Sequence, residues 1–393
     1  MIRAYKFLLR PTVGQAIALG EMLRDHCSLY NGALQERRDA YRHPSKTSIN
    51  YGMQSGQLKD IRAFDPERQG RWWFSSQQAT LRRIKAGDKP GYPRFRGVNW
   101  FDTVDFPRDG DGCRWDSTPH TPVTRVRLQG VGHVRVNQHR PVLGAVRTVS
   151  VKREGRKWFV VLTTDQALPE PLPATGSHVG IDLGIASFLT DSNGTHIPNP
   201  RHASKAACKL QAAQRALSRF PRCRVKDRTR NHQRAVEKVA ALHGKVRRQR
   251  LDHAHKTALA LVREHDFIAH EDLKIRNMSK APAPKPDPDA PGVFLPNGAA
   301  AKAGLNRSIA DAGWGVFLTI LNAKAESAGR EVMAVDPRNT SRTCPACGHT
   351  AKENRPTQEK FHCVDCGHQA HADEVGARNV LRAGLVRRHA DTA

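Results

Sequence analysis

The chain has 393 residues, with 64 Lys and Arg against 37 Asp and Glu, which gives a formal net charge of +27 at neutral pH. This length predicts two or three domains with a sizeable core, and it excludes a small fold that depends on disulfides. The positive charge is spread along the whole chain. It therefore indicates an anionic polymer as partner, and nucleic acid is the commonest one.

The sequence gives no sign of a membrane protein. No apolar run approaches the ~20 residues of a membrane span, and the N-terminal apolar stretch is too short for a signal peptide. Four of the eight cysteines are scattered, and the other four form two CxxC pairs. This clustering favours a metal site in a reducing compartment over a disulfide framework. We expect a cytoplasmic protein with no membrane partner.

The first third of the chain predicts a strand and then helices. Residues 2–9 alternate between apolar and polar side chains, and apolar residues at helical spacing predict a helix from Thr12 to about residue 42. More helical sequence follows. Residues 71–85 place aromatic rings beside cations, which suits base stacking and phosphate contact. A core position for the tryptophans remains an equal alternative.

Four side chains on this last predicted helix are candidates for nucleic-acid contact. Amide and guanidinium groups can address base edges, and an aromatic ring can stack on a base. The candidates are Trp72, Gln77, Gln78 and Arg82.

A basic loop rich in Gly and Pro, residues 87–97, leads into a β-rich stretch. Short alternating strands with glycine turns over about 98–165 predict a small barrel that includes the strand at 2–9. We therefore expect a barrel domain from residues 1–10 and 90–170, with a helical insertion at 11–89. A Pro-rich segment, 167–177, supplies a linker at 171–177.

The second half alternates between strands and helices, which is typical of an α/β domain. An apolar strand ends in Asp182, and a hairpin turns at Asn193-Gly194. We expect helices at about 202–219, 227–264 and 305–328, strands at 266–275 and 330–337, a mobile loop at 279–300 and a short closing helix.

Three acids lie at the ends of these elements. Asp182 and Glu271 each end a strand, and Asp373 opens the last helix. Any one of them could be a strand-end or helix-capping residue. Carboxylate oxygens suit Mg²⁺, and two such ions a few Å apart would stabilise the attacking and leaving oxygens of a phosphodiester displacement. Three acids in this order, in a strongly basic chain, favour the metal site.

The two CxxC pairs have the spacing C-x2-C-x15-C-x2-C, which is typical of a zinc ribbon. Each pair is followed by a glycine, in CPACGH and CVDCGH, so that two thiolates point at one ion. Four thiolates leave no open coordination position, and the zinc is therefore structural. The expected ligands are Cys344, Cys347, Cys363 and Cys366.

Several motifs in order resemble the TnpB family of nucleases from insertion sequences, which are related to type V CRISPR effectors. They are KFLLRPT, YNGAL, KPGYPRFRG, GIDLGI, IAHEDL, VDPRNTSRTCPACG and HADEVGARN. The resemblance implies an RNase H-like (RuvC) nuclease domain at 178–340 and 371–393, interrupted by a zinc ribbon at 341–370. It also implies that the N-terminal barrel is a wedge domain and that its helical insertion is a recognition domain.

The same resemblance implies a function. A guide RNA from the transposon end would pair with double-stranded target DNA beside a short adjacent motif, and a monomer would cut it with Mg²⁺. Asp182, Glu271 and Asp373 would be the catalytic acids. A nuclease-inactive guided repressor and a direct strand-transfer transposase are the alternatives. The chain departs from the family at His371, where Asp is more usual, at Val375-Gly376-Ala377 in place of Asn-Ala-Ala, and at Arg342 in place of Gln.

Overall fold

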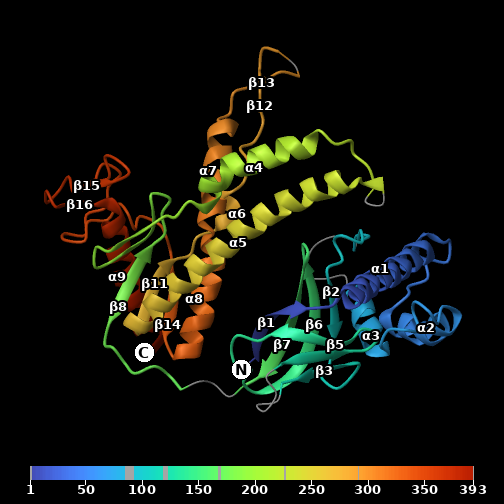
Figure 1. Cartoon of the computed structure of the whole chain (residues 1–393). Coiled ribbons are helices and arrows are strands. Elements are labelled where there is room, and N and C mark those ends of the chain that lie inside the picture. The colour runs from blue at the N-terminus through green and yellow to red at the C-terminus, as the bar shows by residue number, and fades with distance from the viewer. Residues whose placement is uncertain are drawn as a thin grey trace. The chain divides into compact units, whose positions relative to one another are not determined.

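The structure is a computed structural model that describes residues 2–84, 93–117, 123–166, 170–224, 227–290 and 292–392. The chain divides into two compact units, Met1–Leu168 and Pro169–Ala393 (Figure 1). This division falls inside the expected Pro-rich segment, of which residues 167–169 lie outside the described ranges. Most of the basic loop at 87–97 also lies outside them. Within these ranges, no helix combines the length and apolar character that a membrane crossing requires.

A seven-stranded antiparallel sheet forms the centre of the first unit, in the order β2-β6-β7-β1-β5-β4-β3. As expected, β1 joins the later strands, because it pairs with both β7 and β5. The sheet is curled (Figure 1), and in the described ranges no ladder joins its two end strands. Its strands are β1 (Ile2–Arg10), β2 (Thr103–Phe106), β3 (Cys113–Asp116), β4 (Arg125–Leu128), β5 (Gly132–Asn137), β6 (Ala145–Glu154) and β7 (Lys157–Asp165).

Three helices complete the core of this unit: α1 (Val13–Arg42), α2 (Tyr51–Phe64) and α3 (Phe74–Arg82). The first begins where the sequence predicts, because Thr12 and Gln15 form a reciprocal capping box. The helix expected over residues 71–85 is shorter than predicted. Trp72 and Trp73 precede it, since α3 begins at Phe74.

The second unit is built on a five-stranded sheet in the order β10-β9-β8-β11-β14. Strands β8, β11 and β14 are parallel, and β9 and β10 add an antiparallel edge. The predicted apolar strands and the hairpin are confirmed. The bounds are β8 (His178–Asp182), β9 (Ser187–Asp191), β10 (His196–Pro198), β11 (Phe267–Glu271) and β14 (Glu331–Val335).

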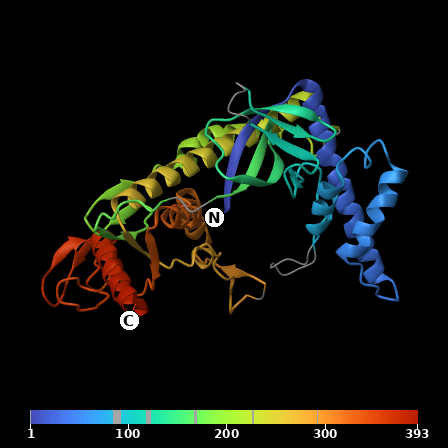
Figure 2. The ribbon, with the colours of Figure 1, turned by 90° about the horizontal axis from the view of Figure 1, so that it is seen from below.

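Helices cover both faces of this sheet, which explains why its central strands are apolar throughout. Ile181 and Ile268 lie in one buried cluster with side chains of α5 (Arg230–Glu264) and α8 (Trp314–Ala328). Phe267 and Ala269 point the other way, into a cluster with α9 (Ala372–Thr392). Helix α4 (His202–Ser218) runs beside α5 in both views (Figures 1 and 2).

Glycines allow α9 to lie very close to the sheet. A Cβ on Gly180 would stand 2.1 Å from the backbone oxygen of Ala377, and one on Gly384 would stand 2.6 Å from the Cβ of Ala269. Any side chain at these two positions would push the helix away from β8 and β11. The first residues of α9 are therefore held against the ends of these strands.

Three expectations for the second unit are corrected. The helix expected at 305–328 is two helices, α7 (Ala299–Ala312) and α8, because Gly313 between them has a left-handed φ of 72°. The segment at 279–300 is not a plain loop. It contains the ribbon β12 (Lys285–Pro286) and β13 (Phe294–Leu295), and α6 (Ile275–Met278) precedes it. The closing helix α9 has 21 residues and is not short.

Candidate active site and metal centre

The four predicted zinc ligands lie together. The sulfur atoms of Cys344, Cys347, Cys363 and Cys366 are all within 4.8 Å of one another. Both CxxC turns contain the same hydrogen bond. The backbone N–H of Cys344 donates to the carbonyl of His349 at 2.9 Å, and that of Cys363 donates to the carbonyl of His368 at 2.8 Å. Gly348 and Gly367 have left-handed φ values of 78° and 73°, which a residue with a Cβ rarely adopts. Four thiols in this arrangement fit Zn²⁺.

A buried asparagine joins the two turns. The side-chain nitrogen of Asn354 donates to the carbonyls of Arg342 and His349, at 2.9 and 3.1 Å, and its oxygen accepts from Val364 N–H at 3.0 Å. Asn354 is fully buried. The short strands β15 (Lys360–His362) and β16 (Gln369–His371) complete this module, and β16 leads directly into α9. Asn354 could not be predicted from the sequence, because nothing in the spacing of the cysteines marks it.

The structure brings the three acids together at one end of the sheet. Asp182 and Glu271 end the adjacent parallel strands β8 and β11, and Asp373 lies in the first turn of α9. Partial burial raises the pKa of Asp182 to about 7, and the charges of Glu271 and Asp373 add to this rise. Burial also raises the pKa of Glu271. The three carboxylates therefore repel one another, and a cation between them would relieve that repulsion.

Glu271 is held in place by a hydroxyl group. Thr340 Oγ1 donates to Glu271 Oε1 at 2.6 Å. The side-chain nitrogen of Asn379, on α9, donates to the carbonyls of Thr340 and Thr343, both at 2.7 Å. This chain of bonds joins the last helix to the second acid through the segment that precedes the first cysteine.

A positive charge lies beside these acids, on an arginine from the cysteine module. A guanidinium nitrogen of Arg355 lies 3.5 Å from Asp373 Oδ1 and donates to the carbonyl of Gln358 at 2.7 Å. Its charge lowers the pKa values of Asp182 and Glu271, against the effect of burial. Nothing in the sequence distinguishes Arg355, which is one of 64 Lys and Arg residues and follows no spacing pattern.

His371 has a clear structural place beside the third acid. Its Nδ1 accepts from the backbone N–H of Asp373 at 3.2 Å, at the start of α9 where N–H groups lack helical partners. Its ring also meets the ring of His196 edge to face, with centroids 4.7 Å apart. His371 therefore acts as a helix cap at the position where the resembling family more often has an acid.

The carboxylates are more widely spread than the thiols. In the described part of the chain, the four cysteines are the only group of three or more His, Cys, Asp or Glu residues whose ligand atoms all lie within 4.8 Å. The acid cluster fits hard cations by its oxygen donors and its mutual repulsion. It does not form the compact shell of a single ion.

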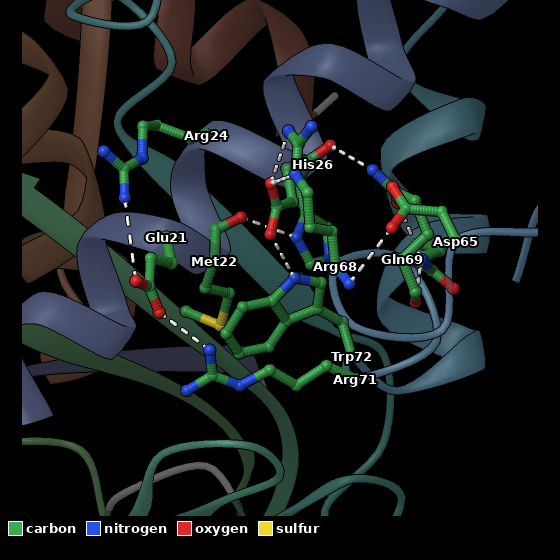
Figure 3. Close-up of polar contacts among 11 residues, drawn as sticks. Glu21, Met22, Arg24, His26, Asp65, Arg68, Gln69, Arg71 and Trp72 are labelled. Atoms are coloured by element: carbon green, nitrogen blue, oxygen red, sulfur yellow. Dashed lines mark hydrogen bonds and ion pairs between the residues drawn. The ribbon is translucent and has the colours of Figure 1, made fainter.

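Trp72 and Gln77 lie in the core, against the expectation that they contact nucleic acid. Trp72 is 1% exposed, and its indole N–H donates to Asp25 Oδ2 at 2.8 Å, while Arg68 donates to Asp25 Oδ1 at 2.9 Å (Figure 3). Gln77 is fully buried and donates to the carbonyl of Gln69. Aromatic and amide side chains of this kind are hydrogen-bonded core residues. The alternative that the sequence left open is therefore correct for Trp72.

Gln78 and Arg82 remain predictions. Arg82 is exposed and its Nε donates to the Tyr51 hydroxyl at 3.1 Å, while Gln78 is half-buried and donates to Ser55 Oγ at 2.9 Å.

Three family models match the chain. Residues 148–281 match OrfB_IS605, described as "Probable transposase", and residues 314–380 match "Cas12f1-like, TNB domain". Residues 1–46 match a model described as "Helix-turn-helix domain". The structure has a strand, β1, and one continuous helix, α1, over most of that range.

Known proteins match over nearly the whole chain. "Putative RNA-guided DNA endonuclease InsQ" of Escherichia coli (strain K12) is 33% identical over 98% of this chain and 92% of its own length. "Putative RNA-guided DNA endonuclease" of Streptomyces pristinaespiralis is 29% identical over 98% and 89%. The solved structure of CasPhi-2 (Cas12j) bound to crRNA and phosphorothioate-DNA covers 98% of this chain and 91% of its own, with 11% identity and a TM-score of 0.43. By its sequence relatives and the OrfB_IS605 match, the chain belongs to the TnpB family.

Proposed function

We propose that this protein is an RNA-guided, Mg²⁺-dependent DNA endonuclease of a transposable element. The observation that supports the proposal most strongly is that Asp182, Glu271 and Asp373 come together from three distant segments. Burial raises the pKa of Asp182, and the charges of the other two acids raise it further. Two relatives that cover most of the chain have names that begin "Putative RNA-guided DNA endonuclease". A net charge of +27 suits a protein that holds RNA and DNA together.

The three acids would hold the Mg²⁺ ions, and two ions are expected. When bound, Mg²⁺ would stabilise the negative charge that develops as water attacks the phosphorus atom and the sugar oxygen leaves. The chain's own residues orient the ligands. Thr340 fixes one oxygen of Glu271, and Gly376 leaves little space beside Asp182. Arg355 keeps a cation at the edge of the cluster, where it could also contact a phosphate.

The two units have separate roles in this proposal. The first unit would be a wedge barrel with a helical recognition insertion, and it would hold the guide RNA and the short motif beside the target. The second would be a RuvC-like nuclease domain with an inserted zinc ribbon. A monomer on one guide would act on double-stranded DNA. The zinc would shape the module that delivers Arg355 and begins α9, without touching the substrate.

The experiment is guided cleavage by purified protein. The RNA that co-purifies is sequenced, its guide segment is replaced, and plasmids with the matching target are incubated with Mg²⁺. We expect a discrete RNA, and cuts only in the matching plasmid. Asp182→Ala should bind guide and target but cut at least about 1,000-fold more slowly. The exposed Glu67→Ala variant serves as the control, because an acid does not bind the phosphates of RNA or DNA.

The two alternatives give different results. If no discrete RNA co-purifies and the protein joins transposon ends to DNA, it is a direct strand-transfer enzyme. If guided binding occurs but the parent protein does not cut with Mg²⁺, it is a guided repressor. Full cleavage by Asp182→Ala would exclude the proposed metal site.

A further inference from the structure

An open pocket of about 450 Å³ lies in the first unit, between the last turns of α1 and the described end of the basic loop, residues 93–97. It is far in sequence from the acids, and neither the zinc module nor the acid cluster contributes to it. Cationic and aromatic side chains form its walls. The lining residues are Arg38, Tyr41, Arg42, Pro93, Arg94 and Phe95.

The wall opposite the helix is fixed by side chains of α1. Asn31 pairs with both backbone groups of Arg96: its nitrogen donates to the carbonyl at 2.8 Å, and its oxygen accepts from the N–H at 2.9 Å. The hydroxyl of Tyr30 donates to the carbonyl of Arg94 at 3.3 Å. The backbone of this segment is thus used in binding the helix, while its side chains stay exposed.

The aromatic rings of the pocket are unusually open for a folded domain. Tyr41 is 66% exposed and Phe95 is 42% exposed, although rings of this size normally bury most of their surface. The guanidinium group of Arg38 lies over the Phe95 ring, 5.1 Å from its centroid. A flat ring and a flat cation already stand together here, which is the arrangement on which nucleobases stack.

Among the residues that the structure describes, nothing balances the charge of the pocket. None of its described lining residues is an acid, and none of Arg38, Arg42 and Arg94 forms an ion pair with another described residue. By contrast, Arg71 and Arg83 of the same unit pair with Glu21 and Asp105. A cation near the C-terminus of a helix is favoured by the helix dipole. That explains Arg42, but it does not explain Arg94, which lies outside the helix.

We propose that this pocket binds one unpaired nucleotide of the guide RNA, with its base against Tyr41 or Phe95 and its phosphate on the arginines. A base inside a duplex has both faces covered by its neighbours, so an aromatic ring can stack only on an unpaired one. The target arrives as a duplex, whereas an RNA that stays bound offers loops and bulges. This inference rests on the proposed function, because that function supplies the RNA.

The test measures RNA binding by the full chain, without Mg²⁺, so that cleavage plays no part. The RNA that co-purifies with the parent protein is the probe. Binding by Tyr41→Ala/Phe95→Ala is compared with binding by Phe64→Ala, since Phe64 is an aromatic residue of the same unit that is 92% exposed and lies outside the pocket. We expect the double variant to bind about 5- to 100-fold more weakly, and the control to bind within 2-fold.

Two further measurements separate stacking from charge and from misfolding. Ultraviolet cross-linking of the parent complex should give RNA adducts on Tyr41 or Phe95, and Arg38→Lys should weaken binding even though it keeps the charge. Thermal melting shows whether each variant is folded. The inference is overturned if the folded double variant binds RNA like the control, or if cross-linking with target DNA also present gives adducts of DNA and not of RNA. If the parent protein carries no RNA at all, the proposed function itself fails, which is a distinct outcome.

Discussion

Gly376 of α9 stands directly against Asp182 at the end of β8: a Cβ at position 376 would lie 3.3 Å from Asp182 Oδ2. This contact is tight, so a methyl group would require the carboxylate to move by a few tenths of an ångström. A larger side chain would displace it much further. The space available to the Asp182 side chain is therefore limited by a residue of the last helix, nearly 200 positions later in the chain.

The Gly376 contact predicts a graded effect of side-chain size. Gly376→Ala should stabilise α9 by about 1 kcal/mol, because glycine is a poor helix former, and should leave cleavage within a few-fold. Gly376→Val should slow cleavage about 100-fold, since a displacement of the order of 1 Å at a catalytic group has this effect. Single-turnover cleavage rates and melting curves measure both. Gly20→Ala, with open space around the glycine, is the control and should leave cleavage unchanged.

Arg355 predicts a stability effect that depends on pH and on metal. Without divalent cations, Arg355→Ala should lower stability at pH 8 by about 1 kcal/mol, because three partly buried carboxylates lose their nearest positive charge. The loss should shrink at pH 5.5. The pKa of Asp182 is raised to about 7, so at that pH the folded state has taken up a proton there and the repulsion falls.

Added Mg²⁺ should restore the melting temperature of Arg355→Ala at pH 8, because the ion replaces the missing charge. Arg355→Lys keeps the charge and should behave like the parent protein in melting. An equal loss at both pH values, unaffected by Mg²⁺, would show that Arg355 acts through packing alone.

The zinc module predicts a link between metal content and cleavage. Cys363→Ser should lower the zinc content below one ion per chain. It should also lower the melting temperature of the second unit by about 5 °C or more. Cleavage should fall with it, because β16 leads directly into the turn of α9 that carries Asp373. Metal analysis, calorimetry and cleavage assays measure the three effects. Cys208→Ser, at an exposed cysteine outside the module, is the control. Undiminished zinc in Cys363→Ser would exclude the ligand assignment.

A buried histidine predicts acid sensitivity in the first unit. Burial lowers the pKa of His26 from 6.5 to about 4. The two ring nitrogens of His26 form hydrogen bonds with Met22 O and Ser76 Oγ. The unfolded chain therefore binds a proton between pH 6.5 and 4 that the folded chain does not. The stability from neutral His26 is present above pH 6.5 and is lost as the pH falls through this window, by about 3 kcal/mol.

Urea unfolding followed by tryptophan fluorescence measures this acid sensitivity, because Trp72 packs near His26. The comparison is with His26→Gln, which cannot take up the proton. The parent protein should lose about 3 kcal/mol more than the variant between pH 6.5 and 4. Parallel losses in both proteins would show that other groups cause the acid sensitivity.

Local patterns in the sequence were enough to predict most of the strands and helices and the group of four cysteines. Alternation predicted β1 and its place among the later strands, helical spacing predicted α1, α4 and α5, and apolar runs predicted the strands that end in Asp182 and Glu271. The spacing of the four cysteines predicted one metal group. These features are local, or they repeat with a fixed period, so a single chain displays them without any knowledge of contacts.

The neighbours of those groups could not be predicted in the same way, because they depend on contacts between distant segments. It placed Trp72 and Gln77 in the core, divided the helix at Gly313, gave His371 the role of a cap and brought Arg355 to the acids. None of these follows from periodicity. A charge or an amide has no preferred neighbour in sequence, and its partner depends on where α9 and the cysteine module cross the ends of β8 and β11. That crossing is set by close approaches at Gly180 and Gly384, which neither composition nor spacing reveals.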